Sequence, residues 1–176
     1  MNDVLASENK KILIIGYGNT LRGDDAVGRK VAETVADWKV PNVRAISVHQ
    51  LTPELAQDIS VCDQVLFVDA FVGGPDGSVE LLSIEAGDSV SAMEHATNPR
   101  SLLALSRALF GASPAAQWVT VPGIKFDLGE GLSAHAERGV QNAVHLIARL
   151  LDIKQCVFDS HCSVWDEAMS IQGARS

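Results

Sequence analysis

The sequence predicts an α/β fold, namely a three-layer α/β/α sandwich around a mostly parallel, twisted sheet of about five strands. Short apolar runs alternate along the chain with longer stretches whose apolar residues recur at helical spacing. Two of the runs, residues 12–15 and 65–68, are apolar at every position, which is typical of strands covered on both faces. We expect residues 1–151 to form a single domain and residues 152–176, where the apolar period is lost, to form a C-terminal tail of uncertain order.

The first strand, residues 12–15, is followed by a glycine-rich turn and then by a helix. Gly16 and Gly18 allow the backbone to turn sharply, and Asn19 also tolerates tight turns. The helix is indicated by large apolar residues spaced along one face: Val27, Val31, Val35 and Trp38.

The next elements are a strand, a short helix and a buried strand. Residues 43–48 alternate well enough for a second strand. Thr52, which a proline follows, can cap a helix that ends near Ser60. Residues 65–68 then form the third strand, and Asp69 closes it.

The second half of the chain adds two strands and two helices. A glycine-rich turn leads to a fourth strand at residues 79–84, which we place near an edge of the sheet. Asn98 precedes a proline and caps a helix that Gly111 ends. Residues 118–121 form the last strand, which the next proline stops, and Ser133 caps a long final helix.

The first loop is not a nucleotide fingerprint, because Leu21 stands where the third glycine of that motif belongs. Asp24 and Asp25 would also repel a phosphate at the helix end that should attract it. For Asp24 we expect a helix-capping role, and for Asp25 capping and chemistry are equally supported by the loop alone.

Composition argues against several classes of partner, and we expect the protein to be in the cytosol. The net charge of -8 argues against nucleic acid and anionic membranes as partners. The longest apolar runs are too short to span a bilayer, and the N-terminus resembles no export signal. The three cysteines lack zinc-site spacing and are interpreted as reduced thiols.

Four polar residues can converge at one edge of the predicted sheet. Asp25, His49 and Asp69 follow strand ends, and His95 lies in a long loop that can reach the same edge. Carboxylates together with imidazoles suit a borderline divalent ion such as nickel, zinc or cobalt. Taken singly, an Asp after a buried strand is more often hydrogen-bonded to loop amides than bound to metal, and a single loop His is usually solvated.

These residues lie in motifs that resemble those of a known family. The segment 16–28, GYGNTLRGDDAVG, resembles the N-terminal signature of the nickel–iron hydrogenase maturation proteases. Residues 65–70 are similar to their second acidic strand end, and His95 is similar in place to their histidine. Residues 129–133 have a counterpart in the branch that serves cytosolic, bidirectional hydrogenases, and the resemblance extends over residues 11–151.

The resemblance implies an endopeptidase that removes the C-terminal extension of the nickel-loaded hydrogenase large-subunit precursor. It implies that Asp25 and Asp69 are catalytic, as in an aspartyl protease, and that Asp25, Asp69 and His95 contact metal. Nickel would be carried by the substrate, and none would be held permanently. One departure is that residues 49–54 stand where many relatives have an acid followed by glycines.

Other functions stay open at this point. The same residues could serve a nickel-binding chaperone that cuts nothing, or a small-molecule metallohydrolase with its own zinc. Nucleotide binding is a more distant alternative. The HExxH and GxSxG signatures of common hydrolases are absent from the sequence. The residues do not decide whether a carboxylate or the ion itself activates the attacking water.

Overall fold

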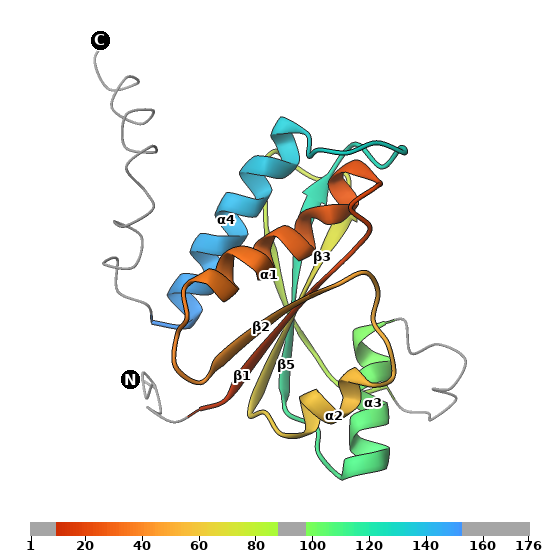
Figure 1. The fold of residues 1–176 in the computed structure, drawn as a ribbon, viewed down its shortest axis with the longest axis vertical. Coiled ribbons are helices and arrows are strands. Elements are labelled where there is room, and N and C mark those ends of the chain that lie inside the picture. The colour runs from red at the N-terminus through yellow and green to blue at the C-terminus, as the bar shows by residue number, and fades with distance from the viewer. Residues whose placement is uncertain (1–9, 88–97, 153–176) are drawn as a thin grey trace. The chain divides into compact units, whose positions relative to one another are not determined.

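The computed structural model describes residues 10–87 and 98–152 of the chain. The described elements run in this order (Figure 1): β1 (Ile12–Tyr17), the 3-10 turn η1 (Gly23–Ala26), α1 (Val27–Asp37), β2 (Val43–Val48), α2 (Leu55–Ser60), β3 (Gln64–Val72), β4 (Glu80–Ile84), α3 (Pro99–Phe110), β5 (Ala115–Gly123) and α4 (Ala134–Leu150). His95, predicted as a site residue, lies outside the described residues, as does all but the first residue of the predicted tail 152–176.

The strands form one five-stranded sheet in the order β2-β1-β3-β5-β4. All neighbouring pairs are parallel except β4 and β5, which pair antiparallel at the edge. The predicted α/β fold with a mostly parallel sheet is therefore confirmed. Because β1, β3 and β5 run in the same direction, the loops that follow them meet at one edge of the sheet.

Helices cover both faces of the sheet (Figure 1). Leu13 and Ile15 of β1 belong to one core cluster with residues of α2 and α3. The alternate residues of the strand face α1, which packs on β1, β2 and β3. The start of α4 packs on the same side as α1, since a side chain at Gly139 would meet Val121 of β5.

By its contacts the chain divides into two compact units, residues 1–144 and residues 145–176. The sheet belongs to the first unit, and the last turns of α4 belong to the second. In the part of the chain that the structure describes, no helix is both long and apolar enough to cross a membrane.

Three strands are longer than the sequence predicted: β1 continues to Tyr17, past its predicted end at Ile15, and β3 and β5 are extended at both ends. β3 and β5 each have nine residues and pair along their whole length, up to Val72 opposite Gly123. Asp69 therefore lies within β3 instead of closing it. Pro122 does not stop β5, because the pairing of β4 with β5 has already ended at Thr120 and no N–H is needed on that side.

Two of the four predicted helix caps, those of Asn98 and Ser133, are confirmed. The Oδ1 of Asn98 and the Oγ of Ser133 each accept a hydrogen bond from the backbone N–H three residues further on, at 2.9 and 3.1 Å. The prediction for Thr52 is wrong. Helix α2 begins only at Leu55, and no side chain caps it.

The close approach of α1 to the sheet requires glycine at position 28. A Cβ on Gly28 would lie 2.3 Å from the carbonyl oxygen of Val68 and 2.5 Å from that of Tyr17. We expect Gly28→Ala to lower the free energy of unfolding by about 3 kcal/mol, because the helix must shift away from the sheet. Gly87→Ala is the control, since its added methyl would meet no atom closer than 3.8 Å. Urea denaturation of the two variants measures the difference, and equal stability would contradict the packing described here.

Candidate active site

Asp25 is held by the turn that follows β1. The backbone N–H of Asn19 donates to Oδ2 of Asp25 at 2.7 Å, and Oδ1 of Asn19 accepts from the N–H of Leu21 at 2.9 Å. Gly18 has a φ of 141°, and a Cβ there would lie 1.8 Å from the backbone oxygen of Asp25. The glycine thus lets the turn close around Asp25. The side chain orders this turn and does not cap α1, for which the structure shows no side-chain cap.

Asp69 lies on β3, in the strand next to β1. Its Oδ1 accepts a hydrogen bond from the N–H of Ala70 at 2.7 Å, and the hydroxyl of Tyr17 donates to the same carboxylate. Burial raises the pKa of Asp69 to about 6, the hydrogen bonds from Tyr17 and Ala70 oppose the rise, and the charge of Asp25 adds to it. Asp25 and Asp69 are therefore close enough to interact electrostatically.

Tyr17 is a site residue that the sequence analysis missed. Burial and the neighbouring Asp69 raise its pKa well above the ordinary value, so the phenol stays protonated and can donate. The neighbouring Trp118 indole opposes this rise. Within the described residues, the buried Nε1 of Trp118 forms no hydrogen bond. The signal in the sequence is the alternation of side chains between the two faces of a strand. Tyr17 lies two residues after Ile15 and therefore on the same face of β1. Asp69 of the neighbouring strand β3 lies on this face of the sheet as well.

The structure brings together two of the four predicted residues. Asp25 and Asp69 lie at the carboxyl edge of the sheet, close enough for the charge of Asp25 to raise the pKa of Asp69. The side chain of His49 is exposed, and its contact with this edge is through its backbone oxygen, which accepts from the N–H of Gly18 at 3.3 Å. His95 lies outside the described residues. Within residues 10–87 and 98–152, no group of three His, Cys, Asp or Glu side chains could hold a metal ion.

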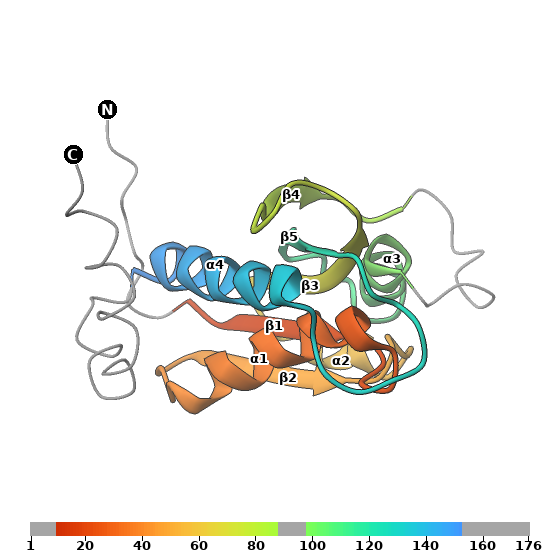
Figure 2. The ribbon, with the colours of Figure 1, turned by 90° about the horizontal axis from the view of Figure 1, so that it is seen from above.

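Asp24 joins the turn that holds Asp25 to the loop after β5, and the expected capping role is wrong. The side chain is fully buried and accepts hydrogen bonds at 2.7–2.9 Å from the backbone N–H groups of Ile124, Lys125 and Ser133 and from the Ser133 hydroxyl. Burial alone would raise the pKa of Asp24, but these bonds outweigh it and lower the pKa. Both views show the two loops side by side (Figures 1 and 2).

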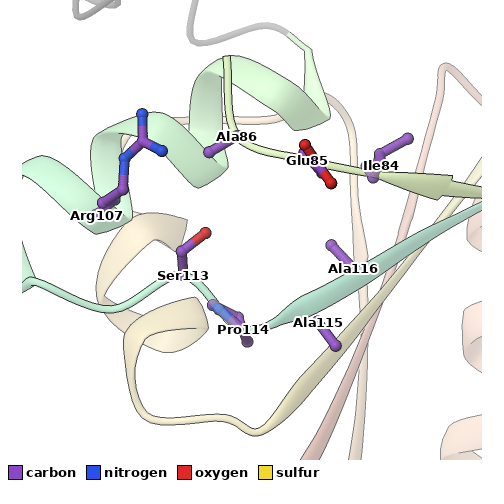
Figure 3. Close-up of a pocket in the computed structure, with 8 residues that line it drawn as sticks. All are labelled: Ile84, Glu85, Ala86, Arg107, Ser113, Pro114, Ala115 and Ala116. Carbon is purple, nitrogen blue, oxygen red and sulfur yellow. The ribbon is translucent and has the colours of Figure 1, made fainter. Parts of the chain in front are cut away.

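A cavity of about 350 Å³ lies beside α3 and the start of β5 (Figure 3). Its lining includes Arg107 of α3 and Glu85 after β4. Ala115 and Ala116, at the start of β5, also line it, whereas the carboxylates lie at the edge where the parallel strands end. The cavity is therefore separate from the candidate active site.

Because the pKa of Asp69 is raised, the ionised form of this residue lowers the free energy of unfolding. Its folded pKa of about 6 lies above the ordinary 3.8, so this destabilisation is complete above about pH 6 and absent below about pH 3.8. We expect Asp69→Asn to raise the free energy of unfolding by about 1–3 kcal/mol at about pH 7.5 and by much less at about pH 4. Urea denaturation at both values tests this. An equal gain at both would show that ionisation of Asp69 is not the cause.

Comparison with known proteins identifies structural relatives. Neither a family model nor a curated protein matches the chain. The NiFe hydrogenase maturation protease HybD from Thermococcus kodakarensis is 24% identical, with a TM-score of 0.62 over 80% of this chain and 99% of that one. The maturation protease HycI from the same organism is 25% identical, with a TM-score of 0.62 over 83% and 95%.

A bacterial structure is similar to this chain to about the same degree. The hydrogenase maturating endopeptidase HybD from E. coli is 22% identical, with a TM-score of 0.62, over 81% of this chain and 92% of that one. The aligned lengths cover nearly all of each relative, so the similarity is one of whole domains. The chain therefore has the fold of the NiFe hydrogenase maturation proteases.

Proposed function

We propose that this protein is an endopeptidase that removes the C-terminal extension from the precursor of a nickel–iron hydrogenase large subunit. The observation that carries the proposal is the meeting of Asp25 and Asp69 at the carboxyl edge of a sheet whose fold is that of such proteases. Two carboxylates in different environments are a common arrangement for acid–base chemistry on a peptide bond.

The two carboxylates suit different tasks. Asp69 has a pKa of about 6, so near neutral pH it can take a proton from water while the water oxygen attacks the scissile carbonyl. The same proton then passes to the leaving nitrogen as the C–N bond breaks. Asp25 is held in place by the Asn19 N–H, and it is suited to contacting the nickel that the substrate carries.

Nickel acts in this scheme as part of the substrate. We propose that Asp25 and Asp69, with His95 as the third contact, touch the ion only when the precursor presents it with its own ligands. Two or three contacts alone give weak binding, so an empty precursor would be docked poorly. Docking of the ion also orients the scissile bond, which raises the cleavage rate.

The branch of the family is a finer proposal. Residues 129–133 resemble the corresponding segment of the branch that serves cytosolic, bidirectional hydrogenases. They lie in the loop that hydrogen-bonds to the turn that holds Asp25. We propose that the precursor of such a hydrogenase is the partner and that processing takes place in the cytosol.

The proposal is tested by mass spectrometry of nickel-loaded and nickel-free precursor after incubation with the protein. We expect the loaded precursor to give two fragments and the nickel-free precursor to stay intact. An uncut precursor whose nickel content has changed would instead indicate a chaperone. Near-stoichiometric zinc in the purified protein, with no cleavage, would indicate a metallohydrolase that acts on small molecules.

A further inference from the structure

We propose that five exposed apolar residues beside the two carboxylates bind an apolar stretch of the precursor polypeptide next to the cleaved bond. This inference rests on the proposed function and names the surface that the substrate uses. We call the surface the apolar rim. It consists of Leu21, Phe71, Val72, Ile124 and Leu128.

The rim residues are exposed to an extent that is unusual for large apolar side chains in one place. Their exposed fractions are 53%, 52%, 74%, 64% and 86% in chain order. A single exposed apolar residue on a protein surface needs no explanation, but a contiguous group marks an interaction site.

Backbone contacts bring the segments that carry the rim residues together at one edge of the sheet. Val72 at the end of β3 pairs with Gly123 of β5, and Ile124 follows directly. On the other side, the carbonyl oxygen of Leu21 accepts a hydrogen bond from the N–H of Gly129 at 2.9 Å, and Leu128 precedes that residue. Three segments that are distant in the sequence therefore carry these apolar residues to the same edge of the sheet.

The rim adjoins the carboxylates on two sides. Phe71 and Val72 continue the strand that carries Asp69, and Leu21 lies in the turn that holds Asp25. An extended peptide advances by about 3.4 Å per residue, so the residues that flank a bond held at the carboxylates must lie over their surroundings. These surroundings are the apolar rim.

The rim is also preorganised. The four hydrogen bonds to the buried Asp24 fix the loop that carries Ile124 and Leu128 before any partner arrives. A surface that is already ordered loses little conformational entropy on binding. Its apolar character suits a polypeptide with large apolar side chains, and not a charged small molecule.

The test measures cleavage of the nickel-loaded precursor by Leu128→Ser and Val72→Ser variants. Both side chains are mostly exposed, so the substitutions should leave the thermal midpoint unchanged. We expect each to raise KM about tenfold while kcat stays near the wild-type value, because the substitution removes apolar contact and not chemistry. Leu109→Ser and Val61→Ser are matched controls, with exposed fractions of 64% and 63% at the opposite edge of the sheet. These controls should keep the wild-type KM.

The outcomes separate this inference from the proposed function. If the wild-type protein cuts the precursor and both rim variants keep its KM, the rim does not bind substrate, and the proposed function stands. If the wild-type protein leaves the precursor uncut, the proposed function itself fails. Sedimentation of the same proteins tests whether a second copy of this chain occupies the rim instead of substrate. A wild-type dimer that Leu128→Ser dissociates without a change in KM would make the rim an interface between copies and overturn the inference.

Discussion

Asp25→Asn is expected to stop removal of the precursor extension while the protein stays folded. The amide oxygen of asparagine can still accept the hydrogen bond from the Asn19 N–H, so the turn is kept. The negative charge that would face the ion and the reacting bond in the proposed scheme is lost. We expect the single-turnover cleavage rate to fall by about a thousandfold or more, as measured with nickel-loaded precursor.

Asp127→Asn provides the control for this experiment. Asp127 is an exposed carboxylate in the loop after β5, so it has the same charge and lies near the same edge of the sheet. Its replacement should leave the cleavage rate within about twofold of wild type. A wild-type rate for the Asp25→Asn variant would restrict Asp25 to ordering the turn, and the catalytic role would then be wrong.

Asp24→Asn is expected to lower the free energy of unfolding by about 3 kcal/mol. The carboxylate accepts four hydrogen bonds with its two oxygens. An asparagine has a single oxygen, so its NH₂ group would face backbone N–H donors and leave them unpaired in a buried position. Urea denaturation at neutral pH measures the loss.

The pH dependence of this loss checks its cause. The hydrogen bonds lower the folded pKa of Asp24, so its contribution is full above the unfolded value and is lost as the pH falls through the folded pKa. The free energies of unfolding of the wild type and the Asp24→Asn variant should therefore become similar only below about pH 4. Two curves that stay parallel down to about pH 2 would show that the charge of Asp24 is not what stabilises the two loops.

Local pattern was sufficient to predict the fold and the meeting of the carboxylates. The apolar run before Gly16 and the helical spacing after Asp25 predicted β1 and α1, since both signals lie within a few residues. The position of Asp69 after a buried run placed it at the same edge as Asp25. This placement needs only the rule that parallel strands end on one side of their sheet.

The tertiary role of Asp24 could not be read from the sequence. Its side chain contacts Ser133, which is 109 positions away, and no local pattern encodes that pairing. The capping prediction followed from the position of Asp24 at a helix start. In the structure, its carboxylate oxygens instead accept hydrogen bonds from the distant loop after β5. The extension of β3 past Asp69 has a similar origin, because pairing with β5 continues where the buried apolar run has ended.

The most direct test of the central claim is to locate nickel in crystals of the protein. Anomalous scattering from crystals soaked in a nickel salt reports the ion's position without reference to activity. We predict a peak in contact with the carboxylate oxygens of both Asp25 and Asp69. A peak at other side chains, with both of these carboxylates left without metal, would contradict the site described above.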